Sequence, residues 1–265
     1  MDDFLSLHSS ERPLLMPNPW DRGSAVLLAS LGYKALATTS SGFAATLGRL
    51  DGQVSRDEAL AHAAELAEAV DVPVSADFEN CFAHDAAGVA ETVRLAAESG
   101  LAGCSVEDFA GREDDRIYDP GEAAERVAAA AEAAHAGPEK FVLTARAENY
   151  VHDRRDLADT IARLQSFQEA GADVLFAPGV RELDEIRELV ASVDRPVNVL
   201  VLPGMPSVSE LGDAGVARIS VGGAFAFAAF GAAAAAGREL LERGTYGYWE
   251  TSTAGAGATF EAFNG

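Results

Sequence analysis

VPVSADFEN (72–80) sets the pattern from which the fold of this 265-residue chain can be inferred. Its acidic residues Asp77 and Glu79 stand two positions apart at the end of an apolar run. Residues two apart on a β-strand point to the same side of the sheet. GCSVED (103–108) and LTARAEN (143–149) repeat this arrangement. Because polar groups inside a sheet are costly unless they bind something, the pattern predicts strands that end at a functional site.

Strand-like and helix-like segments alternate along the whole chain. The polar rows that end four of the strands are Thr38 and Ser40; Ser75, Asp77 and Glu79; Ser105 and Glu107; and Thr144, Arg146 and Glu148. The predicted strands cover about 14–19, 35–40, 72–79, 103–107, 141–148, 173–178, 196–202 and 217–222. The predicted helices cover about 22–31, 55–70, 85–99, 121–136, 156–170, 181–192, 207–214 and 224–243. Asp21 and the Ser55–Glu58 capping box mark two of the helix starts.

Repeated strand–helix units of this number and length predict an α/β fold, the (β/α)₈ TIM barrel, as a single domain over residues 1–265. The alternative is an open, doubly wound sheet. No G-x-G-x-x-G motif follows the first strand, which disfavours that alternative. Barrel enzymes carry their chemistry at the C-terminal ends of the strands, where the polar rows lie.

Composition limits the partners and the compartment. The formal charge of −22, from 42 acidic against 20 basic residues, argues against nucleic acid or an anionic membrane surface as a partner. The two cysteines indicate a reducing, cytoplasmic compartment without a disulfide framework. We expect no signal peptide in residues 1–13, and the apolar run 224–236 is too short to cross a bilayer.

The carboxylates of the rows predict a metal site. Asp77, Glu79 and Glu107 would lie on neighbouring strands at one level, where they repel each other unless a cation or a proton intervenes. Oxygen ligands favour Mg²⁺, with Mn²⁺ possible. The alternative is ion pairing inside the barrel, for instance of Glu107 or Glu148 with Arg146.

Other residues near the strand ends suit substrate binding and proton transfer. The fork of Arg146 matches a carboxylate or phosphonate, and a turn at Ser41, Gly42 and Phe43 could present backbone N–H groups to an anion. His84 and His152 fall in the loops after the third and fifth strands and could transfer protons, although a loop histidine is more often simply solvated.

The chain resembles the isocitrate lyase/phosphoenolpyruvate mutase superfamily. The resemblance spans about residues 14 to 225 and is carried by NPWDRGSA (18–25), ATTSSGFAATLGRLDG (37–52), VSADFEN (74–80), GCSVED (103–108), LTARAEN (143–149), AGADVLFAPG (170–179) and GVARISVGG (215–223). It implies a (β/α)₈ barrel whose last helix, within about 224–265, is exchanged with a neighbouring subunit in a homodimer or homotetramer. It also implies Mg²⁺ and a 2-oxo- or 2-hydroxy-acid substrate.

The resemblance assigns a role to each matching residue. It implies that Asp77 binds Mg²⁺ directly, and that Glu79, Glu107 and Asp51 complete the metal's surroundings. The residues implied to bind substrate are Ser41, Gly42, Phe43 and Arg146, and we add Asn149 beside them as a candidate.

The loop 109–118 departs from the family pattern. Lyase members carry a Lys-x-Cys-Gly-His loop here, whereas this loop has neither cysteine nor histidine, nor the asparagine of the phosphonate mutases. We therefore expect a Mg²⁺-dependent lyase that cleaves a C–C bond of a small 2-oxo or 2-hydroxy (di)carboxylic acid through an enolate. Its catalytic residues would be Arg146 and Glu107, with Tyr118, His84 or His152 as proton donor. The alternatives are P–C bond chemistry of the phosphonopyruvate type and a catalytically silent small-acid binder.

Overall fold

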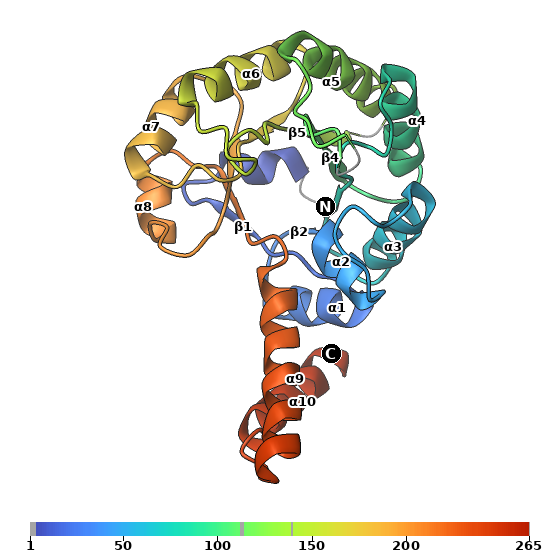
Figure 1. The fold of residues 1–265 in the computed structure, drawn as a ribbon. Helices are drawn as coiled ribbons and strands as arrows, with labels where there is room; N and C mark the ends of the chain where they lie inside the picture. The colour runs from blue at the N-terminus through green and yellow to red at the C-terminus, as the bar shows by residue number, and fades with distance from the viewer. Residues whose placement is uncertain (1–3, 112–113, 139, 265) are drawn as a thin grey trace.

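The computed structural model describes residues 4–111, 114–138 and 140–264, which form an α/β barrel of eight parallel strands surrounded by helices (Figure 1). The strands are β1 Leu14–Met16, β2 Leu36–Ala37, β3 Val74–Asp77, β4 Gly103–Glu107, β5 Val142–Arg146, β6 Val174–Phe176, β7 Val197–Leu200 and β8 Arg218–Ser220. The helices are η1 Phe4–Ser9, α1 Arg22–Ser30, α2 Ser40–Thr46, α3 Arg56–Glu68, α4 Ala86–Ala97, α5 Pro120–His135, α6 Leu157–Glu169, α7 Leu183–Ala191, α8 Val208–Asp213, α9 Ala224–Arg243 and α10 Trp249–Phe263.

The strand order β1-β8-β7-β6-β5-β4-β3-β2 leaves one seam, between β1 and β2. Two hydrogen bonds cross this seam. Ala37 N donates to Pro17 O at 3.1 Å, and Asn18 Nδ2 donates to Thr38 O at 2.9 Å. The barrel is therefore nearly closed. The predicted TIM-like barrel is confirmed, and the alternative of an open sheet is wrong.

The two faces of the strands explain why this sequence closes into a barrel. Apolar residues such as Cys104, Val106 and Leu143 belong to the large core between the strands and the outer helices. A second, smaller cluster joins Leu14 and Val142 to the N-terminal helix η1 and contains residues of β1, β2, β5 and β6. The polar residues of β3, β4, β5, β7 and β8 are thereby left for the barrel interior.

Helix starts follow the capping rules. Ser55 and Glu58 form the predicted capping box at α3, with Ser55 N donating to Glu58 Oε2 at 2.9 Å. Asp21 caps α1 as predicted, since its Oδ1 accepts from Ser24 N at 2.7 Å. Thr39 caps α2 in the same manner, accepting from Gly42 N.

Several predicted boundaries are wrong, and the difference matters for the site. Most strands are shorter than predicted, so four members of the polar rows lie outside their strands, namely Thr38, Ser40, Glu79 and Glu148. Ser40 is the first residue of α2, a helix where the sequence suggested a turn. Glu79 lies past the end of β3 with φ of 49°, a left-handed conformation that turns its side chain out of the strand's alternation.

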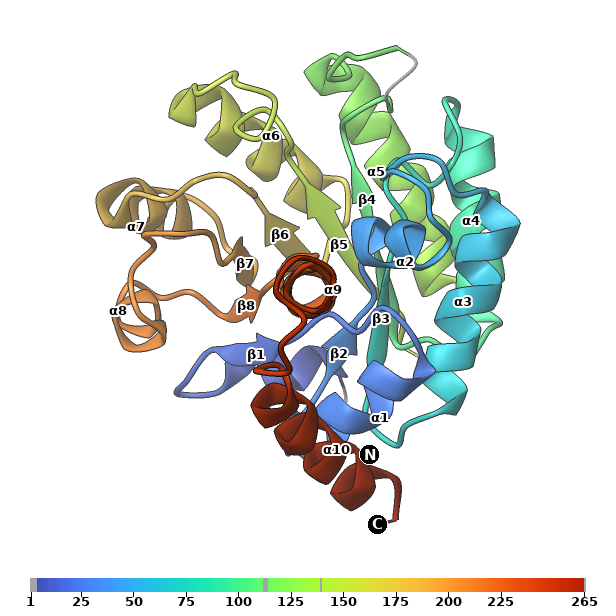
Figure 2. The same cartoon turned by 60° about the horizontal axis from the view of Figure 1, so that its bottom comes forward.

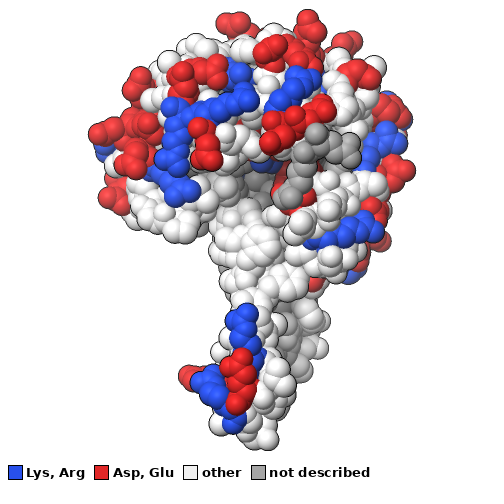
Figure 3. Space-filling view, in the orientation of Figure 1, with Lys and Arg blue, Asp and Glu red and all other residues white. Residues whose placement is uncertain are grey.

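The C-terminal helices α9 and α10 project from the barrel as a stalk (Figure 1), and Figure 2 looks almost along α9. The stalk is mostly uncharged on the face seen in Figure 3, with charges gathered near its far end. Within the described part of the chain, α9 alone is long and apolar enough to match a membrane span, and nearly all of it is exposed. One such helix is weak evidence for a membrane.

Candidate functional site

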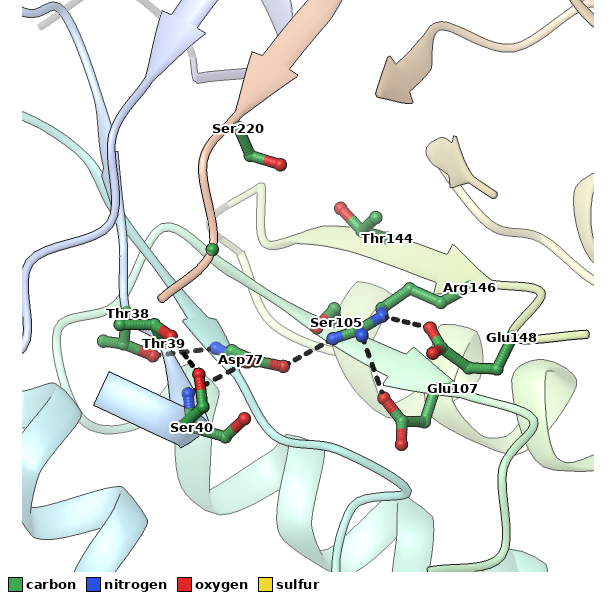
Figure 4. Close-up of polar contacts among 12 residues, drawn as sticks. Thr38, Thr39, Ser40, Asp77, Ser105, Glu107, Thr144, Arg146, Glu148 and Ser220 are labelled. Carbon is green, nitrogen blue, oxygen red and sulfur yellow. Dashed lines mark hydrogen bonds and ion pairs between the residues drawn. The ribbon is translucent and has the colours of Figure 1, made fainter. Parts of the chain in front are cut away.

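Arg146, the last residue of β5, lies at the centre of an ion-paired cluster (Figure 4). Its Nη1 lies 2.6 Å from Asp77 Oδ1 on β3, and its Nη2 lies 3.2 Å from Glu107 Oε2 on β4. Its Nε donates to Glu148 Oε1 at 2.8 Å. The guanidinium also lies over the Phe176 ring, 5.2 Å from its centroid. The ion pairing that the sequence left open as an alternative is therefore present.

Register explains why these side chains meet. Glu107 on β4 pairs with Arg146 on β5, and Arg146 pairs with Phe176 on β6. The strands run parallel, so residues at one register level meet at the same height inside the barrel. Two residues earlier, Ser105 and Thr144 form the next level down.

Burial and neighbouring charges shift the pKa values of Glu107 and Arg146 in opposite directions. Burial raises the pKa of Glu107 well above its usual range, and the charge of Arg146 opposes that rise. Burial alone would lower the pKa of Arg146, but Glu148, Glu107 and Asp77 raise it instead. The cluster thus keeps Arg146 charged.

Asp77 is fixed by the chain that enters α2. Its backbone N–H donates to Thr38 Oγ1 at 2.9 Å, and its Oδ2 accepts from Ser40 N at 3.0 Å. Because Oδ1 faces Arg146, both carboxylate oxygens have a partner. Asp77 therefore connects the cluster at β3–β5 to the first turn of α2.

A cavity of about 190 Å³ lies beside this connection. Of the predicted site residues, Ser41, Asp51, Asp77 and Arg146 line it. The other polar side chains in its wall are Asn18, Thr38, Thr39, Ser40, Ser75, Ser105, Asn198, Arg218 and Ser220. The wall therefore combines anion-binding groups with two carboxylates.

The donor chemistry fits Mg²⁺. Asp51 and Asp77 offer carboxylate oxygens to the same cavity, and Mg²⁺ is commonly held by one or two carboxylates with water completing its shell. No group of three His, Cys, Asp or Glu side chains arranged for a metal occurs in the ranges described above. Glu107 contacts Arg146, and Glu79 lines a neighbouring void of about 10 Å³ instead.

The segment Ser41-Gly42-Phe43 forms the first half of α2. Ser41 Oγ lies 3.2 Å from Thr39 Oγ1 at the cavity wall. A Cβ on Gly42 would lie 2.5 Å from Thr39 Cγ2, so only glycine fits here. Phe43 faces away from the cavity and stacks on His62, with ring centroids 3.7 Å apart.

The three candidate proton donors lie outside the cavity wall. Tyr118 OH lies 3.0 Å from His84 Nδ1, and its ring lies beneath the guanidinium groups of Arg116 and Arg126. The ring of His152 stacks on Phe109, with ring centroids 3.8 Å apart. These residues come together around the loop 109–118, of which residues 112 and 113 lie outside the described residues.

Asn149 also lies away from the cavity. Its Nδ2 donates to Thr160 Oγ1 at 2.7 Å, while its buried Oδ1 has no hydrogen-bond partner among the described residues. Asn149 therefore connects the end of β5 to α6.

Sequence reasoning missed two features of the site. Asn198 on β7 and Arg218 and Ser220 on β8 line the cavity, and Arg218 and Ser220 show the same two-residue spacing as the other rows. The second feature is Asp108, whose Oδ2 accepts from Arg163 Nη1 at 3.0 Å and whose Oδ1 accepts from Glu148 N at 2.8 Å. The Glu-Asp pair 107–108 was visible in the sequence, but the partner on α6 was not.

Comparison with known proteins identifies relatives of the whole barrel. The family model of phosphoenolpyruvate phosphomutase matches residues 4–241. A crystal structure described as a candidate lyase/mutase from Burkholderia cenocepacia is 49% identical, with a TM-score of 0.91 over 94% of this chain and 90% of that chain. The uncharacterized protein Rv1998c of Mycobacterium tuberculosis is 35% identical over 240 residues, which is 90% of this chain and 89% of that protein. A structure of oxaloacetate acetylhydrolase with the product oxalate shares the fold, at 24% identity, 92% and 88% coverage and a TM-score of 0.84.

Proposed function

Because the chain belongs to the phosphoenolpyruvate mutase/isocitrate lyase superfamily, we propose that it is a Mg²⁺-dependent lyase. Its substrate would be a small 2-oxo or 2-hydroxy (di)carboxylic acid whose C–C bond breaks through an enolate. The observation that carries this proposal is the meeting of Asp77, Arg146 and the first turn of α2 at one cavity. This cavity is lined both by carboxylate oxygens that could bind a cation and by cationic groups that could bind an anion.

Each part of the cavity has a task in this reaction. When bound, Mg²⁺ supplies Lewis-acid stabilisation of negative charge on a substrate oxygen. Asp77 and Asp51 would hold it, while Arg146 would orient the substrate carboxylate by its planar fork. Ser41, whose side chain lies at the cavity wall, would donate a hydrogen bond from its hydroxyl to the same carboxylate. These fixed donors cost no reorganisation when charge develops.

The proton step separates this chain from lyases with a cysteine loop. Tyr118 and His84 form a hydrogen-bonded pair beside the loop 109–118, and this pair supports the proposal that one of them transfers the proton. Neither side chain lines the cavity. A Tyr118→Phe variant that keeps substrate affinity but loses at least tenfold in kcat would support this role.

A substrate screen tests the proposed reaction. Purified protein with MgCl₂ is incubated with oxaloacetate, 2-methylisocitrate, 2,3-dimethylmalate and phosphonopyruvate, and the products are identified by NMR. We expect C–C cleavage of one of the acids and its loss in Asp77→Asn. Asp184→Asn, which removes an exposed carboxylate on α7, is the matched control and should keep the activity. Binding without turnover of any acid would support a silent binder instead.

P–C bond chemistry is the second candidate, and the family model named for a phosphomutase favours it. The same screen separates the two reactions. Formation of inorganic phosphate or of an enol phosphate from phosphonopyruvate, with the other acids unreacted, would show that the protein cleaves P–C bonds and not C–C bonds.

We also propose that α9 and α10 pack on a second copy of the chain, in a homodimer or homotetramer. Large apolar side chains are exposed along both helices, and Leu241 is 86% exposed. The exposed members are Phe225, Phe227, Phe230, Leu240, Leu241, Tyr246, Trp249, Phe260 and Phe263. Light scattering should find an oligomer that Phe230→Asp dissociates, while Val208→Asp on α8 leaves it intact. A monomer that binds lipid vesicles would contradict the proposal.

A further inference from the structure

Arg218, the first residue of β8, lies inside the barrel below the ion-paired cluster. Only 3% of its surface is exposed, and it lines the cavity beside Asp77 and Arg146. Its Nη2 donates to Thr144 Oγ1 at 3.1 Å, which places the guanidinium at the level of Thr144. Thr144 precedes Arg146 by two residues on β5, so this level lies roughly 6–7 Å deeper at ~3.3 Å per residue.

The partners of Arg218 are all neutral. Its Nε donates to Asn198 Oδ1 at 3.0 Å, and its Nη1 lies 3.3 Å from His8 Nε2. Nδ1 of His8 lies 3.2 Å from the carbonyl oxygens of Phe4 and Leu5, so it carries the proton and Nε2 accepts from Arg218. Burial, and then the charge of Arg218, lower the pKa of His8 to about 3, which keeps its ring neutral.

Arg218 is thus a buried cation that no carboxylate compensates within the described ranges. A guanidinium has five N–H donors, and three of them are used here, so two remain for a ligand. Burial, followed by the charge of Arg146, lowers the pKa of Arg218 to about 9. An uncompensated buried charge is strongly unfavourable, which indicates that a partner is missing.

The other buried arginines among the described residues differ from Arg218. Arg146 has three carboxylates and Arg163 has two. Arg126 donates to the backbone carbonyls of Asn80, Ala83 and His84, and it does not line the cavity. Each of those three therefore has carboxylates or carbonyl oxygens that compensate its charge. Arg218 alone of these combines neutral partners, free donors and an open cavity.

We propose that Arg218 binds a second anionic group of the substrate. The first carboxylate would lie at the level of Arg146 and Ser41, and the second group would extend down the barrel axis to Arg218. The substrate would then be a dianion, either a dicarboxylate or a phosphonocarboxylate, and not a monocarboxylic acid. The cavity of about 190 Å³ suits an acid of this size. The inference rests on the proposed function for which end of the substrate reacts. The binding of the second anionic group at Arg218 does not depend on that function.

Three ligands that differ in one group test this assignment. Malate, 2-hydroxybutyrate and 2-hydroxy-3-phosphonopropionate share the 2-hydroxy acid end and carry a carboxylate, a methyl or a phosphonate at the other. Isothermal titration with MgCl₂ present should show that the wild-type protein binds one of the dianions at least tenfold more tightly than 2-hydroxybutyrate. The tighter of the two dianions identifies the group that Arg218 takes.

Arg218→Met should reduce that preference to about onefold and leave the affinity for 2-hydroxybutyrate unchanged. Arg218→Lys, which keeps the charge, should retain part of it. Because methionine removes an uncompensated charge, the ligand-free melting temperature of Arg218→Met should stay level or rise. A lower melting temperature with equal loss of all three ligands would show a structural role and overturn the proposal. The proposal would also be overturned if the wild-type protein showed no preference for a dianion, or if Arg218→Met kept that preference.

These binding measurements do not depend on turnover. If the preference for a dianion depends on Arg218 but no C–C bond is cleaved in the substrate screen, the proposed function fails and the anion site stands. If an acid is cleaved while the wild-type protein shows no preference for a dianion, the proposed function stands and the anion site at Arg218 fails.

Discussion

Arg146 Nη1 lies 2.6 Å from Asp77 Oδ1, and this contact joins the residue suited to bind substrate to the residue suited to bind metal. The pair comes from two strands that lie 65 residues apart in the sequence, since β3 ends at Asp77 and β5 begins at Val142. Arg146 fills the space among three carboxylates. A cation bound at Asp77 would share this carboxylate with Arg146, so we expect metal binding and substrate binding to influence each other at this contact.

Replacing Arg146 should destabilise the barrel. Arg146→Gln leaves Asp77, Glu107 and Glu148 without their cation, and breaking a buried pair in this way costs about 3–5 kcal/mol. The free energy of unfolding in urea measures the loss, with Arg187→Gln on exposed α7 as the control. A loss below about 1 kcal/mol would show that the cluster is solvated rather than ion-paired.

Gly42→Ala tests the packing of α2 against the site. The new Cβ would lie 2.5 Å from Thr39 Cγ2 and 3.3 Å from Ala226 Cβ on α9. We expect a loss of about 1–3 kcal/mol in unfolding free energy, typical of overpacking, together with weaker ligand binding. Gly121→Ala on α5, where a Cβ meets nothing within 4 Å, is the control. Equal behaviour of the two variants would contradict the close packing at Gly42.

The pair of Asp108 and Arg163 should hold the two ends of the loop 109–118 together. Arg163 Nη1 donates to Tyr118 O at 2.8 Å as well as to Asp108. Burial raises the pKa of Asp108 to about 7, so this carboxyl is poorly compensated without Arg163. Arg163→Met should cost about 3–5 kcal/mol of unfolding free energy. The same substitution at the exposed Arg94 should cost under about 1 kcal/mol, and equal losses would refute the role.

Stability should fall in mild acid because of His62. Burial lowers the pKa of His62 from 6.5 to about 4, so between these pH values the unfolded chain binds a proton that the folded chain does not. The free energy of unfolding therefore decreases as pH falls from 6.5 to 4, by at most about 3 kcal/mol from this residue. His62→Phe keeps the stack on Phe43 and should flatten the pH dependence, although His8 still contributes. An unchanged slope would exclude His62 as the cause.

The alternation of residues was enough to predict the barrel and the level at which Asp77, Glu107 and Arg146 meet. Apolar residues facing helices and polar residues facing inward follow from strand geometry, which is local in sequence. Ser40 and Glu79 escaped this rule because a helix cap at Thr39 and a left-handed residue end the strands early. Those ends depend on hydrogen bonds to neighbouring strands, such as Asp77 to Ser40, that no single segment shows.

The interaction partners of charged side chains were harder to predict from the sequence than the fold. Asp77, Glu107 and Arg146 were placed together, but the sequence could not decide between a metal and an ion pair, because both use the same residues at the same strand ends. Arg218 was overlooked although its spacing from Ser220 follows the same rule. Its meaning comes from the absence of a carboxylate near it among the described residues, and only three-dimensional contacts reveal that.

Magnesium-dependent turnover in the wild type and in Asp77→Asn tests the central claim most directly. The rate of C–C cleavage of the best acid from the screen is measured against MgCl₂ concentration after removal of metal with a chelator. We predict that activity depends on added Mg²⁺ in the wild type and in Asp184→Asn, and that Asp77→Asn loses at least a hundredfold at every concentration. Cleavage that continues in the chelator-treated protein, or that survives in Asp77→Asn, would contradict a metal site at Asp77.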